Sequence, residues 1–166
     1  MNTLDDLVVR VAGLLSQRGE WLTVAESCTG GWVAQALTSV AGSSAWFDRG
    51  FVTYSNAAKV EMLGVPENTL ERHGAVSEAT ARAMAQGALR HSHGDWSLAI
   101  TGIAGPSGGS LEKPVGTVCF AWAHRDGGCE AHTRHFAGDR MAVREQSVSY
   151  ALRGLVERLG SDTIFT

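Results

Sequence analysis

The chain has 166 residues and only three cysteines, and so small and odd a number does not support a disulfide framework. It also lacks any apolar run approaching the ~20 residues that a membrane-spanning helix needs. Basic residues form no stripe and the net charge is −3, so no electrostatic nucleic-acid footprint is expected. We therefore expect a reduced, cytoplasmic protein that binds neither nucleic acid nor a membrane surface.

Internal repeats, low-complexity segments and linkers are missing too, and 44% of the residues are hydrophobic. That content suffices for one compact domain covering residues 1–166. At the N-terminus, Asp5 and Asp6 stand where a signal peptide needs positive charge. We expect an amphipathic helix there, capped near Thr3. Its predicted buried side consists of Leu4, Leu7, Val8, Val11 and Leu14.

Further along, helix-like and strand-like segments alternate and then give way to a hairpin. Predicted strands are Trp21–Val24, Trp46–Tyr54, Trp96–Thr101, Val115–His124 and Cys129–Phe136, the last two joined around Asp126 to Gly128. Predicted helices are Trp32–Val40, Asn56–Leu63, one restarting near Pro66, Ser77–Arg90 with Ser77 as N-cap, and one from Gly138 and Asp139 to about Leu159 with Asp139 as N-cap. This order predicts an α/β fold, a three-layer α/β/α sandwich with a mixed β-sheet.

The most informative segment is AESCTGG, which joins the first predicted strand to the next helix. Ser27, Cys28 and Thr29 place hydroxyl and thiol groups at the strand end, and Gly30 and Gly31 allow close backbone approach. The first N–H groups of a helix have no intrahelical partner and can hold an oxyanion or a phosphate. An ordinary N-capped helix would show much the same local pattern.

Two other predicted strand ends bring chemistry to the same edge of a parallel sheet. Tyr54 and Lys59 follow the second strand, and Thr101 and Gly102 begin a glycine-rich loop after the third. No histidine lies in these segments, which favours a serine–lysine pair over a serine–histidine triad. Desolvation would have to lower the lysine pKa by about three units for it to act as a base near neutrality. Tyr54 would relay the proton or hold Lys59.

Other residues leave alternatives open. Cys28 is a rival nucleophile, and Thr29 is a candidate oxyanion or phosphate ligand. Arg140 and Arg144 lie one helical turn apart near a helix start, which suits a phosphate, although solvated arginines are the commoner case. Metal binding is not expected, because strand alternation puts His132 on the face opposite Cys129 and His135.

Taken together, the segments AESCTGG, GSSAWFDRGFVTYSNAAK, HGAVSE, TGIAGPSGGS, EKPVGTV and the closing GDR with Arg144 resemble the CinA C-terminal domain family. They occur in order over nearly the whole chain, from about Leu4 to Leu159. The resemblance implies a three-layer α/β/α sandwich, in agreement with the pattern of predicted elements. It also implies hydrolysis of the carboxamide of nicotinamide mononucleotide to nicotinate mononucleotide and ammonia, in pyridine nucleotide salvage.

By that resemblance, Ser27 is the acylated nucleophile and Lys59 its base, with Tyr54 assisting. Backbone N–H groups from Thr29 to Gly31 hold the oxyanion, and Thr101 positions the amide; Arg140 and Arg144 are candidates for the 5′-phosphate. No metal or organic cofactor is implied. The alternatives are a non-catalytic nucleotide- or protein-binding module of the competence and damage-inducible type, or an amidase or esterase for another small substrate. The oligomeric state stays open, a homo-oligomer included.

Overall fold

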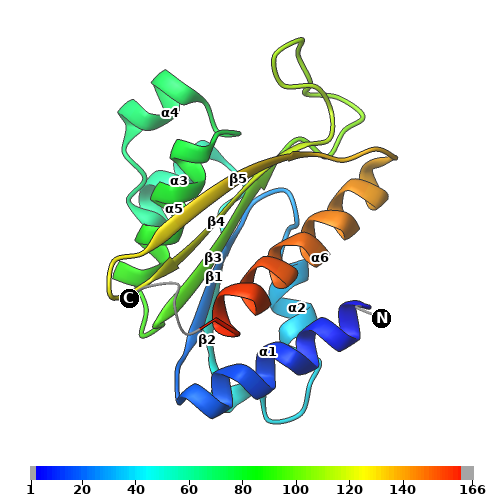
Figure 1. Cartoon of the computed structure of the whole chain (residues 1–166). Coiled ribbons are helices and arrows are strands. Elements are labelled where there is room, and N and C mark those ends of the chain that lie inside the picture. The colour runs from blue at the N-terminus through cyan, green and yellow to red at the C-terminus, as the bar shows by residue number, and fades with distance from the viewer. Residues whose placement is uncertain (1–2, 162–166) are drawn as a thin grey trace.

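A computed structural model describes residues 3–161, which form a twisted five-stranded sheet between two layers of helices (Figure 1). The sheet has the spatial order β2-β1-β3-β4-β5. The strands are β1 (Leu22–Glu26), β2 (Phe47–Val52), β3 (Trp96–Gly102), β4 (Thr117–His124) and β5 (Cys129–His135). The helices are α1 (Leu4–Arg18), α2 (Trp32–Thr38), η1 (Ser43–Ala45), α3 (Asn56–Leu63), α4 (Glu67–His73), α5 (Glu78–Arg90) and α6 (Arg140–Leu159).

Strand direction divides the sheet into two parts. Strand β1 pairs in parallel with both β2 and β3, whereas β4 is antiparallel to β3 and β5. The three parallel strands therefore all end at one edge of the sheet, where β4 begins. The mixed sheet and the three-layer α/β/α architecture predicted from the sequence are confirmed. So is the hairpin, whose strands pair from Thr117 opposite His135 to Ala123 opposite Cys129.

The two faces of the sheet carry side chains of different size, and each face suits its own helices. Large side chains such as Leu98, Phe120 and Trp122 pack with the helices α1, α2 and α6. The opposite face presents Ala99 and Ala121 to the alanine-rich helix α5, with α3 and α4 outside it (Figure 1). Small side chains on both partners let α5 lie close to the sheet.

The helix ends follow the predicted caps. Thr3 accepts a hydrogen bond from the Asp6 N–H, and the Asp6 carboxylate accepts one from the Thr3 N–H, which together form a capping box. Ser77 and Asp139 cap α5 and α6 as expected. The buried side of α1 differs from the prediction at three residues: Leu15 is fully buried, whereas Leu4 and Leu14 are only partly buried.

Strand and helix boundaries shift by a few residues from the predicted ones. Strand β1 extends to Glu26 rather than ending at Val24, and the short helix η1 was not predicted. Across residues 3–161, no helix is at once long enough and apolar enough to cross a membrane.

Candidate active site

Ser27 lies directly beyond the last residue of β1, at the edge where the parallel strands end. Its N–H donates to the Ile100 carbonyl of β3 at 3.0 Å, and the Glu26 carbonyl accepts from the Thr53 N–H of the β2 end at 2.8 Å. The serine is thus fixed between its two neighbouring strands. Only 7% of its surface is exposed, so a molecule that reaches the hydroxyl is largely shielded from water.

Lys59, on α3, is buried beside this serine. Its Nζ lies 3.1 Å from Ser27 Oγ and donates to the Thr53 carbonyl at 2.9 Å, with 1% of the residue exposed. Among the described residues no carboxylate lies within ion-pair distance of the amine. Burial disfavours the charged form and lowers the pKa of Lys59 below its ordinary value of 10.5. The two residues that the sequence predicted as a catalytic pair are therefore in contact.

The rival nucleophile, Cys28, is held as a thiol. Burial is the main cause that raises its pKa to about 12, despite the opposing influence of Arg144 and Lys59. Because the thiolate is the reactive form, this environment favours the serine hydroxyl as the attacking group.

Glu26 stabilises the turn between β1 and α2, and the sequence pattern did not identify it as a site residue. Its carboxylate is 1% exposed and accepts from Thr29 Oγ1 at 2.6 Å, the Val33 N–H at 2.9 Å and the Ala34 N–H at 3.0 Å. A strand residue thereby caps α2, whose own N-cap position is Gly31 without a capping side chain. The sequence feature that could have indicated this role is a carboxylate at the end of an apolar strand, next to a glycine turn.

Two glycines let the chain turn from β1 into α2. Gly30 and Gly31 have φ values of +59° and +100°, a left-handed region that residues with a Cβ rarely adopt. The Gly30 N–H donates to the Ser27 carbonyl at 3.0 Å. Within residues 3–161, the N–H groups of Cys28, Thr29 and Gly31 have no hydrogen-bond acceptor outside their own residue. Of these three residues, Cys28 lines the cavity beside Ser27, so its N–H is the candidate donor to an oxyanion.

A cavity of about 300 Å³ opens beside Ser27 and Lys59. Its lining comes from the ends of β1 and β3, the start of α3, the loop after β3 and the start of α6. The residues that bear polar side chains there are Ser27, Cys28, Tyr54, Asn56, Lys59, Thr101, Ser107 and Arg140. Such a volume suits part of a nucleotide-sized molecule, with the remainder at the open mouth.

Tyr54 and Arg140 form one side of this mouth. The Arg140 guanidinium donates to the Tyr54 hydroxyl at 3.1 Å and to the Gly105 carbonyl at 2.9 Å, and Tyr54 is 63% exposed. Deeper in the cavity, the Thr101 hydroxyl donates to the Ala75 carbonyl at 2.8 Å. Its proton is therefore used, and its oxygen lone pairs are left to accept from a ligand.

Four residues that the sequence predicted to bind the substrate do not line this cavity: Thr29, Gly30, Gly31 and Arg144. The Thr29 hydroxyl is occupied by Glu26. Arg144 donates to two carbonyls of the turn and stacks on Trp32, so its guanidinium is committed to the protein. Sequence spacing put Arg140 and Arg144 on one helix face, and only the fold separates their surroundings.

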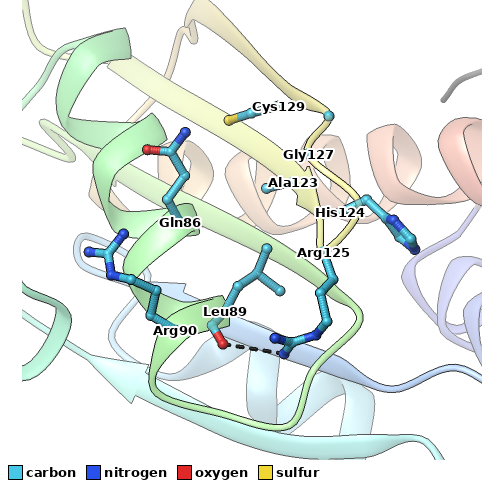
Figure 2. A pocket seen from close by; sticks show the side chains of 9 residues that line it. Gln86, Leu89, Arg90, Ala123, His124, Arg125, Gly127 and Cys129 are labelled. Atoms are coloured by element: carbon cyan, nitrogen blue, oxygen red, sulfur yellow. Dashed lines mark hydrogen bonds between the residues drawn. The ribbon is translucent and has the colours of Figure 1, made fainter.

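A second hollow lies at the opposite end of the sheet, between α5 and the β4–β5 turn (Figure 2). Its arginines hold backbone carbonyls: Arg125 donates to the carbonyls of Leu89 and Gly94, and Arg90 donates to that of Leu63. No serine, lysine or aspartate is among its lining residues. The arginines there act as supports for the chain around the end of α5.

The fold and this arrangement define a class: a mixed-sheet α/β/α domain with a buried serine–lysine contact at the carboxyl edge of its parallel strands. The profile of the CinA C-terminal domain family matches residues 4–159. The chain is 54% identical over 160 residues to "Nicotinamide-nucleotide amidohydrolase PncC" from Escherichia coli K12, which covers 96% of this chain and 97% of that protein. The protein of the same name from Enterobacter agglomerans is 55% identical over 150 residues, with 90% and 92% covered.

Solved structures agree with the profile. The competence/damage-inducible protein from Agrobacterium tumefaciens superposes with a TM-score of 0.91 at 47% identity, covering 95% of this chain and 96% of that chain. The competence damage-inducible protein A from Klebsiella pneumoniae gives a TM-score of 0.93 at 44% identity, with 98% and 100% covered. The chain belongs to the CinA C-terminal domain family.

Proposed function

We propose that this protein is a nicotinamide-nucleotide amidohydrolase, which converts nicotinamide mononucleotide and water to nicotinate mononucleotide and ammonia. The observation that carries the proposal is the 3.1 Å contact between Ser27 Oγ and a buried Lys59 Nζ without a carboxylate partner among the described residues. The names of relatives more than half identical over nearly the whole chain supply the substrate. The product would re-enter NAD synthesis.

Acylation begins with a neutral lysine. The Thr53 carbonyl accepts one amine hydrogen at 2.9 Å, which leaves the nitrogen lone pair of the neutral form free to face Ser27. Ser27 Oγ attacks the carboxamide carbon while its proton moves to Lys59 Nζ. Lys59 then gives that proton to the amide nitrogen, the C–N bond breaks, and ammonia leaves an ester on Ser27.

Deacylation repeats the steps with water. Lys59 takes a proton from water as the hydroxyl oxygen attacks the ester carbon, and it returns the proton to Ser27 Oγ when the C–O bond to the serine breaks. The negative charge of each tetrahedral intermediate needs a donor, and the N–H group of Cys28, which lines the cavity, is our candidate. Nothing in this sequence of steps requires a metal or an organic cofactor.

The lining of the cavity suggests how the substrate lies. Thr101 Oγ1 accepts from the carboxamide NH₂, because its own proton is given to the Ala75 carbonyl. Arg140, at the mouth and one residue after the N-cap of α6, takes the 5′-phosphate, with Tyr54 beside it. This division assigns the phosphate to Arg140 and not to Arg144.

The test is ammonia release from nicotinamide mononucleotide by the purified protein and by Ser27→Ala. We expect turnover by the wild type, a loss to background in Ser27→Ala, and mononucleotide affinity unchanged within a few fold. Binding without turnover by the wild type would instead support a non-catalytic binding module. Activity retained by Ser27→Ala and lost in Cys28→Ala would transfer the nucleophile role to the cysteine.

A further inference from the structure

Arg144 lies half-buried on α6, yet it is directed at the turn that carries the nucleophile. Its Nε donates to the Cys28 carbonyl at 3.1 Å and its terminal NH₂ group to the Thr29 carbonyl at 3.2 Å. The guanidinium also stacks on the Trp32 ring, 5.5 Å from its centre. Across residues 3–161 no carboxylate lies within ion-pair distance of it. A buried or half-buried arginine usually pairs with an acid, so the two carbonyls are its main partners.

The geometry of the peptide unit gives these contacts a consequence for catalysis. In a planar trans peptide the C=O and the following N–H point in opposite directions. A guanidinium that fixes the Cys28 carbonyl therefore also fixes the direction of the Thr29 N–H, and the Thr29 carbonyl fixes the Gly30 N–H. The Gly30 N–H in turn donates to the Ser27 carbonyl at 3.0 Å. The Ser27 carbonyl shares its peptide unit with the Cys28 N–H, so the clamp also fixes the direction of that donor at the cavity.

The planar fork of an arginine suits this task better than a lysine would. Two carbonyls of successive residues are bridged by one rigid group, whereas an ammonium on a flexible stem has no fixed fork. The positive charge also polarises both peptide units, which makes their N–H groups stronger donors. From the other side, Glu26 holds Thr29 through its hydroxyl. The Glu26 carboxylate and the Arg144 guanidinium therefore both hold this turn, the first through a side-chain hydroxyl and the second through two backbone carbonyls.

We propose that Arg144 is a positioning residue: by clamping the Cys28 and Thr29 carbonyls, it fixes the turn that places Ser27 and the Cys28 N–H at the cavity. This inference rests on the serine–lysine mechanism proposed above. It separates the roles of two arginines one helical turn apart: Arg140 binds the substrate phosphate, and Arg144 acts on the chemical step through the backbone.

The test compares Arg144→Ala and Arg144→Lys with Arg140→Ala, and uses Arg153→Ala, an exposed arginine of the same helix, as the control. Arg144→Ala should lower kcat about tenfold to a hundredfold with KM changed less than about threefold, since outright loss of one oxyanion donor costs roughly 10²–10³ in kcat. Arg144→Lys should lie between Arg144→Ala and the wild type. Arg140→Ala should mainly raise KM, and Arg153→Ala should match the wild type. Thermal denaturation shows whether each variant is folded under the assay conditions, so that its rate can be compared with that of the wild type.

A binding measurement in the Ser27→Ala background gives a second readout that does not depend on turnover. Nicotinamide mononucleotide should bind Ser27→Ala and Ser27→Ala/Arg144→Ala equally, whereas Ser27→Ala/Arg140→Ala should bind it more weakly. Weaker binding in the Arg144 double variant, wild-type kcat in Arg144→Ala, or full activity of Arg144→Lys would each overturn the clamp. Turnover by Ser27→Ala alone would instead overturn the proposed mechanism, so the two failures are distinguishable.

Discussion

Charged side chains gather at both ends of the sheet, but the two ends differ in whether buried acidic and basic groups are paired with each other. At the end away from the cavity, the Glu20 carboxylate meets Arg18 Nε at 2.5 Å, His124 Nε2 at 2.9 Å and Trp96 Nε1 at 2.9 Å. At the Ser27 end, the hydrogen bonds that the buried Lys59 and Glu26 make within residues 3–161 are all to neutral groups. At the first end the Glu20 carboxylate is paired with basic groups. At the Ser27 end the Glu26 carboxylate and the Lys59 amine are not paired with each other.

The pKa directions follow from this difference. Burial acts to raise the pKa of Glu20, but hydrogen bonds from His124, Trp96 and Arg18 outweigh it and lower the pKa. At the other end burial of Lys59 outweighs the opposing influence of Cys28, and the pKa of Lys59 falls. A carboxylate paired with Lys59 would stabilise the ammonium and remove the base. Isolation of the lysine is thus the feature that makes this end reactive.

The strongest test of the comparison removes the isolated amine. Lys59→Met should lower kcat by at least about 10⁴-fold, because serine and lysine act as one unit. Stability should stay equal or rise, since a buried amine without an ion-pair partner is replaced by an apolar side chain of similar length. Ammonia release and thermal denaturation measure the two effects. A variant that remains active, or one that is inactive only because it has unfolded, would contradict this assignment.

The pH dependence sharpens the same point. Because the pKa of Lys59 is lowered, the neutral amine forms below pH 10.5, and kcat/KM should rise with pH along a limb with its midpoint below that value. Between the lowered pKa and 10.5 the unfolded chain binds more protons than the folded one, so the stability deficit of the wild type against Lys59→Met should shrink as pH rises there. Rate–pH profiles and denaturation at several pH values provide the check. A midpoint of the kcat/KM–pH profile at or above pH 10.5 would contradict the proposal that Lys59 acts as a neutral amine.

Much of the fold was predictable because its signals are local. Thr3, Ser77 and Asp139 precede their helices as caps, and the alternation of segments predicted the layers. The strand ends were less certain: β1 reaches Glu26 because the Thr53 N–H pairs with the Glu26 carbonyl, a contact between segments far apart in sequence. The helical period predicted that Leu14 rather than Leu15 is buried, because the period alone does not show against which side of α1 the helix α6 packs.

The site was predictable where side chains follow parallel strands, and the structure brings Ser27 and Lys59 together as expected. Two of its parts carry no such signal. The Thr53 carbonyl that holds Lys59 is a backbone group, which no side-chain pattern indicates. Arg140 and Arg144 share a helix face in any spacing analysis. They differ only in what the fold places opposite them: Tyr54 and Gly105 for one, Cys28 and Thr29 for the other.

Glu26→Gln should have an intermediate effect on both stability and activity. A glutamine offers one oxygen and one NH₂ where three donors now converge, so at least one buried N–H or the Thr29 hydroxyl loses its acceptor. We expect a loss of about 2–3 kcal/mol in the free energy of unfolding. Since the turn that carries Ser27 is loosened, we also expect kcat to fall about tenfold, with KM within a few fold. Chemical denaturation and steady-state kinetics measure these, and a variant with normal kinetics would show that Glu26 serves stability alone.

Glu20→Gln is the matched change at the paired end and should have the smallest effect. Its carboxylate is partly exposed, so the loss should be about 1 kcal/mol, with kcat and KM unchanged because the cluster lies at the far end of the sheet. The pKa of Glu20 is lowered in the folded protein, so the wild-type advantage is present above the ordinary value of 4.5 and is lost as pH falls through the lowered pKa. Denaturation midpoints of both proteins, measured from pH 7 down to pH 3, should therefore converge in acid. If Glu20→Gln impaired turnover as Glu26→Gln is expected to, the two ends would be coupled, and the separation of a paired end from a reactive end would fail.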